Sequence, residues 1–393
     1  MQRTKIQHGK IISQKGIGHG TILIEGSKIV GVEHADIQAP DAKVIDAKGN
    51  FVSPGFIDLH VHGGNGFDFM DGTEQAYQEI SILHARHGTT SIAPTTMSCS
   101  HNTLKGILSA FETFKNKQFS GSCFIGIHIE GPYFAFNQRG AHDGRYIRSP
   151  KADEYKEIIS TSASVARWSA APELPGALEF GNYLRSKKIL PSLAHTDAIY
   201  EEIITAFKHG FTHATHLYSA MSGVTKKNGF RYAGAVESAF LIDEMTVEII
   251  ADGAHLPPPL LQLVYKIKGP EKIALITDAM RGAGLAAGPS VLGSREDGLP
   301  VIIEDGVAKL PDRSAFAGSV ATADRLIRNM IQMAGAPLVD AVRMMTTTPA
   351  EIMNLSDKKG TIEVGKDADI VIFDDDLQVK MTMVQGKIVY EEQ

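Results

Sequence analysis

The sequence predicts an α/β protein, a TIM-like (β/α)8 barrel with a small β-sandwich domain formed by both ends of the chain. Between residues 53 and 358, short apolar segments alternate with longer segments of helical period, which is typical of βα units and a parallel sheet. About eight of these apolar segments follow one another, and a closed barrel needs eight strands. The two ends alternate in short β-like runs with no helix-length pattern, which predicts a separate small sheet.

The elements follow one another in the order that this fold requires. The N-terminal end predicts strands separated by Gly or Asp-Ala turns, at residues 5–12, 21–25, 28–32 and 43–46. Barrel strands are predicted at residues 56–61, 90–95, 124–130, 167–171, 189–194, 213–216, 246–250 and 273–277. Helical periods are predicted at residues 74–87, 200–209, 321–334 and 337–346. The C-terminal end predicts strands at residues 368–374, 379–384 and 387–390.

These elements define the expected domains. Residues 1–52 and 359–393 are assigned to the small β-sandwich domain, and residues 53–358 to the catalytic barrel. Two barrel loops look long, because residues 131–150 and 281–299 are rich in turn residues such as Gly and Pro. Long loops on this face of a barrel usually serve the active site.

Composition and charge restrict the class of partner. The chain of 393 residues is 43% hydrophobic, enough for a sizeable core, and its 39 basic and 45 acidic residues give a net charge of -6. We expect neither nucleic acid nor an anionic membrane as a partner, because this balance does not attract polyanions. No stretch approaches the roughly 18 apolar residues of a membrane span. Cys99 and Cys123 are too few for a disulfide framework, so we expect a reducing, cytoplasmic location.

Side chains with metal-ligand chemistry fall at the predicted carboxyl ends of barrel strands, where barrel active sites lie. Taken alone, Glu130 could be a solvated residue at a loop entry, and Asp278 could be a metal ligand, a general base or a helix N-cap. Ordinary residues would scatter over the chain, whereas these coincide at the ends of strands 1, 3, 5, 6 and 8. The sequence therefore predicts a metal site built from His60, His62, Glu130, His195, His216 and Asp278.

Three other histidines are excluded from this site. His128 shares the inward parity of Glu130 but lies one layer deeper, so it is interpreted as a packed, hydrogen-bonded core residue. His213 has the wrong parity in its strand. His209 ends a predicted helix, where the helix dipole favours it.

The same residues lie in motifs that resemble those of the amidohydrolase superfamily, and within it the N-acetylglucosamine-6-phosphate deacetylases, along almost the whole chain. The set of motifs is highly specific, although each piece alone is not. Residues 359–371 also resemble the strand-rich return with which amidohydrolases complete their small β-sandwich. The motifs are Pro-Gly-Phe-Ile-Asp-Leu-His-Val-His-Gly (54–63), Gly-Ile-His-Ile-Glu-Gly-Pro-Tyr (126–133), Arg-Gly-Ala-His (139–142), Ala-His-Thr (194–196), Thr-His-Leu-Tyr (215–218), Asp-Gly-Ala-His (252–255) and Thr-Asp-Ala-Met (277–280).

The resemblance implies metal-dependent hydrolysis of N-acetylglucosamine-6-phosphate to glucosamine-6-phosphate and acetate, a step of amino-sugar catabolism. It implies a divalent metal, zinc or iron, with one or two ions per subunit. Glu130 as the strand-three ligand favours the deacetylase branch, because relatives such as dihydroorotases use a carboxylated lysine elsewhere. Since this chain retains both His60 and His62, we expect a second metal near the first.

The resemblance also implies how the sugar phosphate is bound. His255 would help to hold the phosphate, together with backbone N–H groups at Ser219 and Ala220, where relatives read Asn-Ala-Met and this chain reads Ser-Ala-Met (219–221). Relatives bring an Arg across a dimer interface, usually in an Arg-x-Pro-Gly setting. The nearest match here is Arg231, in Phe-Arg-Tyr-Ala-Gly (230–234). We therefore expect a homodimer.

Asp278 and His142 are the predicted catalytic residues. By the resemblance, His142 reaches the acetamide carbonyl from the long third loop. A divalent metal lowers the pKa of a bound water to about 7. Asp278 is expected to accept the proton of this water and to protonate the leaving amine, while His142 helps to stabilise the developing oxyanion.

Three alternatives differ in substrate or class. The substrate could be another N-acetyl amino-sugar phosphate, of galactosamine type. A cyclic amide, a nucleobase or a dipeptide, as for other amidohydrolases, is disfavoured by the Arg-Gly-Ala-His and Asp-Gly-Ala-His loops. A barrel that has lost catalysis and serves as a scaffold is a different class that a fold alone never excludes; the intact ligand set with Asp278 argues against it.

Overall fold

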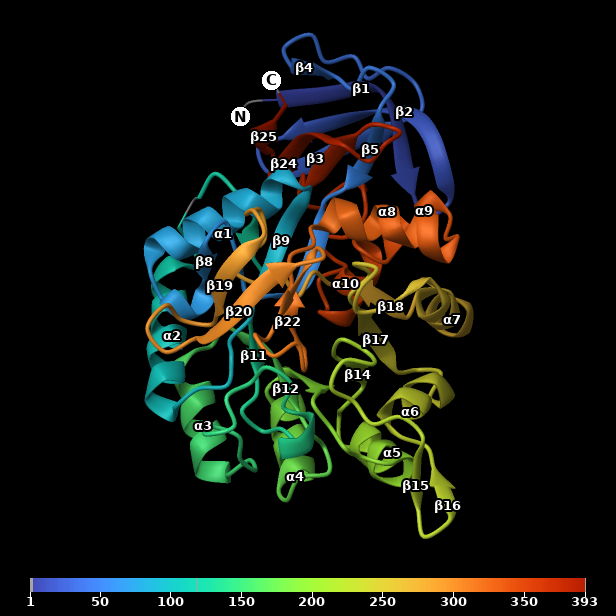
Figure 1. The fold of residues 1–393 in the computed structure, drawn as a ribbon. Helices are drawn as coiled ribbons and strands as arrows, with labels where there is room; N and C mark the ends of the chain where they lie inside the picture. The colour runs from blue at the N-terminus through green and yellow to red at the C-terminus, as the bar shows by residue number, and fades with distance from the viewer. Residues whose placement is uncertain (1–2, 118, 393) are drawn as a thin grey trace.

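The computed structural model describes residues 3–117 and 119–392, and parallel strands form its centre (Figure 1). The larger parallel sheet has the order β11 (Ile127–Glu130), β12 (Val165–Ala170), β13 (Leu190–Leu193), β14 (His213–Ala214), β17 (Thr246–Ile249) and β18 (Ile273–Leu275). The smaller has the order β10 (Cys123–Phe124), β9 (Thr89–Pro94) and β6 (Phe56–Val61). All eight strands predicted between residues 56 and 277 overlap these strands, and the one predicted at 124–130 is divided between β10 and β11.

Single parallel bridges join the two sheets on both sides. One pairs Thr95, just after β9, with His128 of β11, and the other pairs Val61 of β6 with Ala279, beyond β18. The Asp278 N–H donates to the His60 carbonyl at 2.9 Å across the second junction. Strands β6, β9 and β11 are buried along their whole length, as expected of parallel strands that are covered on both faces. The parallel strands therefore form one curled sheet.

Helices cover the outside of this curled sheet (Figure 1). Helix α1 begins where the Thr73 side chain accepts a hydrogen bond from Ala76 N–H, and the positive charge of Arg86 in its last turn suits the helix dipole. The predicted helix at 337–346 is wrong in its bounds, because the chain turns at Met344–Thr346 and starts a second helix. The helices are α1 (Glu74–Arg86), α2 (His101–Phe114), α3 (Ala152–Thr161), α4 (Ala177–Ser186), α5 (Tyr200–Lys208), α6 (Ala235–Leu241), α7 (Pro258–Lys268), α8 (Ala323–Ala334), α9 (Leu338–Arg343), α10 (Thr347–Ile352) and the short 3-10 turns η1 (Phe69–Asp71) and η2 (Phe136–Gln138).

Both ends of the chain contribute to one further sheet, at the top of Figure 1. Its apolar face is buried around Ile6, Ile22, Ile370 and Met383. The seven predicted end strands are all present within it, and β5, which was not predicted, joins the two ends. The order is β25 (Lys387–Glu391), β24 (Val379–Val384), β23 (Ile370–Phe373), β5 (Phe51–Pro54), β1 (Arg3–Ser13), β2 (Gly16–Glu25) and β3 (Lys28–Glu33), with β4 (Lys43–Asp46) beside β1.

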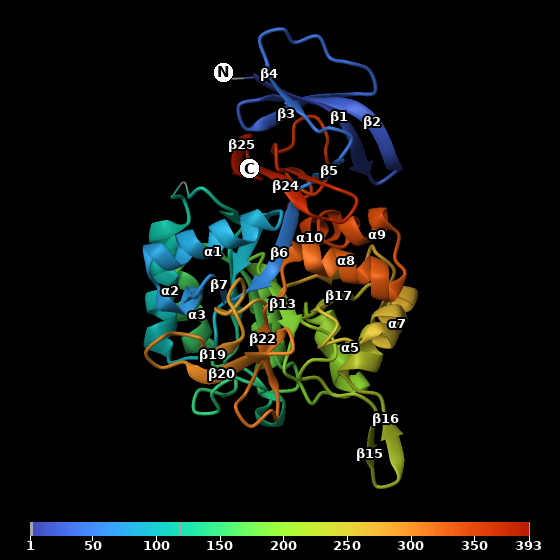
Figure 2. The same ribbon diagram turned by 45° about the horizontal axis from the view of Figure 1, so that its top comes forward.

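The segment predicted as the long loop 281–299 is only partly a loop. It contains β19 and continues into an antiparallel sheet of β19 (Gly288–Leu292), β20 (Leu299–Glu304), β21 (Val307–Lys309) and β22 (Phe316–Ser319). A tight turn at Asp305 and Gly306, both with positive φ, joins β20 to β21. The smaller pairs are β7 (Gly63–Gly64) with β8 (Phe67–Asp68), and the hairpin β15 (Thr225–Lys227) with β16 (Phe230–Tyr232), which projects from the body in Figures 1 and 2.

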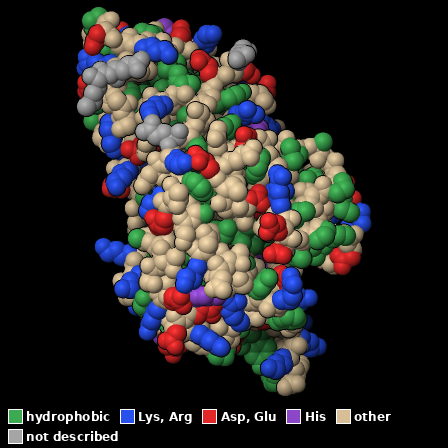
Figure 3. All heavy atoms as spheres, turned by 90° about the vertical axis from the view of Figure 1, so that its left-hand side faces the viewer, with side chains coloured by type: hydrophobic (Ala, Val, Ile, Leu, Met, Phe, Trp, Pro, Cys, Tyr) green, Lys and Arg blue, Asp and Glu red, His purple; other side chains and the backbone are tan. Residues whose placement is uncertain are grey.

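Acidic and basic side chains are interspersed over the face drawn in Figure 3. This distribution agrees with the small net charge of the chain. Among the residues that the structure describes, no helix has both the length and the apolar character needed to cross a membrane.

Candidate active site

Six buried side chains from five strand ends converge at one end of the curled sheet. They divide into two groups whose ligand atoms lie within 4.8 Å of one another: His60, His62 and Asp278 in the first group, and Glu130, His195 and His216 in the second. These are the six residues that the sequence predicted as metal ligands, and the structure brings all of them together.

The first group has the spacing of a tetrahedral ligand set. The Nε2 atoms of His60 and His62 are 3.2 Å apart. Asp278 Oδ1 lies 3.4 Å from His60 Nε2 and 3.1 Å from His62 Nε2. With ligands about 2.0–2.1 Å from a metal, neighbouring atoms of a tetrahedral set are about 3.3 Å apart. The observed separations match this edge length.

Glu130 connects the two groups. Its Oε2 lies 3.4 Å from His60 Nε2 and 3.2 Å from His62 Nε2. Its Oε1 lies 3.0 Å from His216 Nε2 and 3.4 Å from His195 Nε2. One carboxylate therefore offers an oxygen to each group, which is the arrangement of a bridging ligand.

The chemistry of the donors fits a divalent metal in each group. The Nδ1 atom of His195 is 2.7 Å from the Gln138 carbonyl, so Nδ1 carries the proton and Nε2 retains its lone pair. The buried His195 Nε2 has no hydrogen-bond partner within the described part of the chain. Imidazole and carboxylate together suit zinc, iron and other divalent ions.

Left-handed backbone at the strand ends aims three of these side chains into the site. His195, His216 and Asp278 have φ of 48°, 30° and 48°, a conformation that costs a non-glycine residue of order 1–3 kcal/mol. Strand β22 supports the last of these turns, because Ser319 N–H donates to the Asp278 carbonyl at 2.7 Å. Gly318 has φ of +70°, and a Cβ there would lie 2.9 Å from the Asp278 oxygen, so β22 requires glycine at this approach.

The electrostatics of the site favour a bound cation. Burial alone would lower the pKa of His60, but the charges of Glu130 and Asp278 outweigh it and raise this pKa to about 9. Burial would likewise raise the pKa of both carboxyls, yet His60 and the other facing imidazoles hold them below their ordinary values. Two ionised carboxylates in a buried site therefore attract positive charge, either as protons on the imidazoles or as a metal.

A cavity of about 290 Å³ opens over the two groups. Among the described residues, its lining includes neither Lys nor Arg, although a sugar phosphate would bring negative charge. His62, Glu130, His195, His216 and Asp278 form its floor, and its walls are formed by Met97, Asn137, Gln138, Gly140, Ala141, His142, Ser219, Ala220, His255, Leu292, Ala315, Phe316 and Gly318.

His142 is fixed as a hydrogen-bond donor toward this floor. Its Nδ1 accepts a hydrogen bond from Ser98 N–H at 3.3 Å, which leaves the proton on Nε2. Nε2 lies 3.5 Å from Glu130 Oε2. Burial lowers the pKa of His142 to about 4, so the ring is neutral near pH 7.

The predicted substrate-binding residues are placed in two different regions. Ser219, Ala220 and His255 line the cavity. The His255 Nδ1 donates to Asp252 Oδ2 at 2.8 Å, which directs the rest of the ring away from Asp252. Arg231 is not among the lining residues of its own chain, because it lies on β16 in the exposed, projecting hairpin (Figure 2).

The three excluded histidines agree with their predicted roles. His128 is buried, with Nε2 2.7 Å from the Ser169 hydroxyl, and His213 is buried 2.7 Å from the Thr246 hydroxyl. His209 caps the C-terminus of α5.

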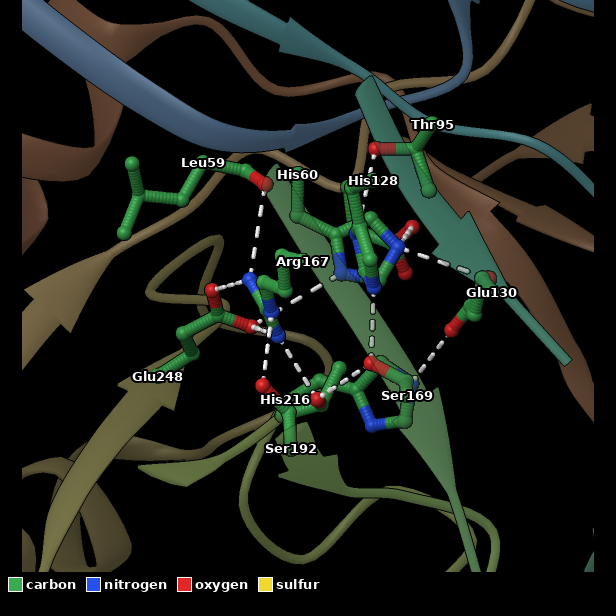
Figure 4. Close-up of polar contacts among 12 residues, drawn as sticks. Leu59, His60, Thr95, His128, Glu130, Arg167, Ser169, Ser192, His216 and Glu248 are labelled. Carbon is green, nitrogen blue, oxygen red and sulfur yellow. Dashed lines mark hydrogen bonds and ion pairs between the residues drawn. The ribbon is translucent and has the colours of Figure 1, made fainter. Parts of the chain in front are cut away.

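Two sets of residues near the site were not predicted. The cavity wall formed by the β19–β22 sheet and the residue before β22 was missed; it consists of Leu292, Ala315, Phe316 and Gly318. The Asp305-Gly306 turn between β-like runs is a recognisable hairpin signal. Arg167 of β12 and Glu248 of β17 form a buried ion pair beneath the donors (Figure 4). Burial alone would raise the pKa of Glu248, but Arg167 holds it well below its ordinary value. The sequence signal for this pair was one charged residue within each of two otherwise apolar predicted strands.

Comparisons with known proteins agree with this geometry. The model of the amidohydrolase family matches residues 51–389. The N-acetylglucosamine-6-phosphate deacetylase of Vibrio furnissii is 31% identical over 388 residues, 98% of this chain and 94% of that protein. The N-acetylgalactosamine-6-phosphate deacetylase of Escherichia coli O157:H7 is 30% identical over 355 residues, 90% of this chain and 92% of that protein.

A solved structure extends the likeness to three dimensions. It is a variant of the N-acetyl-D-glucosamine-6-phosphate deacetylase of Mycobacterium smegmatis in complex with N-acetyl-D-glucosamine-6-phosphate. It shares 27% sequence identity with a TM-score of 0.89, covering 99% of this chain and 100% of that chain. This chain belongs to the amidohydrolase family, in its group of N-acetylglucosamine-6-phosphate deacetylases.

Proposed function

We propose that this protein hydrolyses the acetamide of N-acetylglucosamine-6-phosphate to glucosamine-6-phosphate and acetate. The observation that carries the proposal is the pair of donor groups joined by Glu130 under a cavity that His142 and Asp278 both line. The relative from Vibrio furnissii and the substrate-bound mycobacterial structure support this choice of substrate.

We assign proton transfer to Asp278 and stabilisation of the developing negative charge to His142. The six converging residues would hold one or two divalent ions, zinc or iron, which when bound supply water activation and polarisation of the acetamide carbonyl. Asp278 accepts a proton from the attacking water while the oxygen of this water bonds to the acetamide carbon. His142 donates its Nε2–H toward the oxyanion that develops there. Asp278 then returns the proton to the nitrogen as the C–N bond breaks.

The phosphate would be bound at the wall of the cavity that His255, Ser219 and Ala220 line. His255 and the backbone at Ser219 and Ala220 are the proposed contacts from the same chain. Because no Lys or Arg of the described residues lines the cavity, a basic group from elsewhere would balance the phosphate charge. We propose Arg231 of a second copy, carried on the projecting hairpin, and therefore a homodimer.

The finer architecture is proposed on the same grounds. The two parallel sheets, bridged on both sides, support a closed (β/α)8 barrel spanning residues 53–358. The sheet shared by the two ends supports a small domain of residues 1–52 and 359–393. We also propose a cytoplasmic location, supported by Cys99 and Cys123, which are both free thiols as expected in a reducing compartment.

The test is acetate release by purified, metal-loaded protein from three substrates measured side by side. N-acetylglucosamine-6-phosphate should be preferred over unphosphorylated N-acetylglucosamine, with one acetate formed per amino-sugar phosphate. A preference for N-acetylgalactosamine-6-phosphate would instead assign the activity of the Escherichia coli relative. If protein that holds metal released no acetate from any of the three substrates, the proposal would be overturned.

A further inference from the structure

A complete polar network lies directly beneath the first donor group. Arg167 and Glu248 are both fully buried and face each other as an ion pair (Figure 4). A guanidinium has five N–H donors. Each is used, in hydrogen bonds to both oxygens of Glu248, the Ser192 hydroxyl at 2.9 Å, the Thr215 hydroxyl at 2.6 Å and the Leu59 carbonyl at 3.4 Å. Arg167 therefore holds the Glu248 carboxylate in one orientation.

This orientation presents Glu248 to His60. Glu248 Oε2 lies 3.7 Å from His60 Nδ1, whereas Oε1 lies 3.2 Å from His213 Nε2. Within the described residues, His60 Nδ1 is buried and has no hydrogen-bond partner at the present distance. The 3.7 Å separation between His60 Nδ1 and Glu248 Oε2 is about 0.5 Å longer than the usual upper limit of an N–H···O hydrogen bond. On the side of the His60 ring that faces Glu248, the only proton available for a hydrogen bond to the carboxylate is the one on Nδ1.

We propose that Glu248, held by Arg167, is a positioning residue that receives the Nδ1–H of His60 and so directs the Nε2 lone pair of His60 into the first donor group. This inference rests on the proposed metal-dependent function. Histidine ligands of metals commonly donate their second N–H to a carboxylate, which fixes the tautomer and strengthens the ligand. An isolated buried carboxylate would be costly, and Arg167 supplies the charge that keeps Glu248 anionic.

The competing explanation is that the pair only ties strands together, since it joins β12 to β17 and reaches Leu59 of β6. Removing one partner would leave an unpaired buried charge and unfold the chain without distinguishing the two roles. Double variants avoid this outcome because they remove both charges at similar volume. Arg167→Met with Glu248→Gln retains an oxygen that can accept from His60, and Arg167→Met with Glu248→Met does not.

The experiment titrates each metal-free protein with Zn²⁺ in competition with a chromophoric chelator. Thermal unfolding of the metal-free proteins verifies that both doubles are folded. His213→Asn is the matched control, because it removes the other imidazole that faces Glu248 and leaves the His60 contact in place. Unaltered protein that binds neither Zn²⁺ nor Fe²⁺ would refute the proposed function. The inference itself is tested by comparing the Zn²⁺ affinity of the variants with that of unaltered protein that binds Zn²⁺.

We expect the Met/Met double to bind one Zn²⁺ about 10- to 100-fold more weakly than the unaltered protein. The Met/Gln double and His213→Asn should stay within about threefold of it, because each retains a side-chain oxygen at position 248 that can accept from His60 Nδ1 and so avoids the loss of this hydrogen bond. Unchanged Zn²⁺ affinity in the Met/Met double would overturn the inference. Equal weakening in both doubles would also overturn it, because the accepting oxygen would then make no difference.

Discussion

The Nε2 atom of His60 faces the Nε2 atom of His62 at 3.2 Å, and neither ring has a hydrogen-bond partner on its Nδ1 among the described residues. Two imidazole nitrogens held this close in a buried site repel each other if both are protonated and form no more than one weak hydrogen bond otherwise. A cation between them and the carboxylates of Glu130 and Asp278 resolves this arrangement.

Removal of metal should abolish acetate release and lower thermal stability. Binding of an ion to the folded chain at 100 times its Kd stabilises the chain by about 2.7 kcal/mol, so chelation should lower Tm. Elemental analysis before and after chelation, with activity and Tm measured on the same samples, checks this. Adding back zinc or iron should restore both, and full activity in protein shown to be metal-free would contradict the proposal.

His142→Ala should lower kcat by about 10²- to 10³-fold, because it removes a neutral donor aimed at the developing oxyanion. KM should change much less, since the interaction strengthens only in the transition state. Steady-state kinetics of acetate release separates the two constants. The matched control is His101→Ala, a partly exposed histidine paired with Glu157 on the surface, which should keep ordinary kinetics. Equal kcat in the His142 variant and the control would remove His142 from the catalytic step.

His255→Ala should reduce kcat/KM for the phosphorylated substrate by about 10- to 150-fold. The reason is that it removes a hydrogen bond to a charged group, which contributes about 1.5–3 kcal/mol. Asp252 holds the ring at Nδ1, so the variant removes an oriented contact. Activity on the unphosphorylated sugar, measured in parallel, should change little. A similar loss on both sugars would place His255 away from the phosphate.

His84 should make folding stability depend on pH. Burial lowers its pKa to about 4, while Nε2 donates to the Gly63 carbonyl at 3.0 Å. The folded pKa lies below the unfolded value of about 6.5, so unfolded chains bind more protons and stability is lost as the pH falls from 6.5 toward 4. Over the 1.5 units from pH 6.5 to 5 this group costs about 2 kcal/mol.

Urea unfolding at pH 7 and pH 5 measures this loss. The variant His84→Gln retains a donor for the Gly63 carbonyl but does not titrate, so it should lose about 2 kcal/mol less than the unaltered protein between the two pH values. Parallel losses in the two proteins would show that His84 does not cause the dependence.

The site was predictable from sequence because its residues lie at the carboxyl ends of predicted strands. A run of buried apolar residues locates β6 and β11, and strand parity then separates His60 and His62 from their neighbours. The same argument could not show that Glu130 offers one oxygen to each group, because side-chain rotamers follow from packing in three dimensions. Nor could it identify the left-handed backbone at His195 and His216.

The fold was predictable to a similar depth. The barrel strands, the end strands and helices α1, α5 and α8 were predicted from hydrophobic period, whereas helices such as α2, α3 and α7 were not predicted. The pairing of the two chain ends in one sheet follows from the β-like runs at each end. The β19–β22 sheet was missed because its segment was interpreted by its Gly and Pro content alone. The buried pair Arg167 and Glu248 was missed because each charge becomes acceptable only opposite the other, across strands β12 and β17 that are far apart in sequence.

The most direct test of the proposed chemistry is acetate release from N-acetylglucosamine-6-phosphate by Asp278→Asn, with bound metal quantified in the same sample. Asp278 lines the cavity and lies 3.1 Å from His62, where a water attacking the acetamide would lose its proton. We expect kcat to fall by about 10²- to 10⁴-fold with metal still bound. Full activity in a variant that retains its metal would contradict the assignment of Asp278 as the proton carrier and, with it, the proposed mechanism.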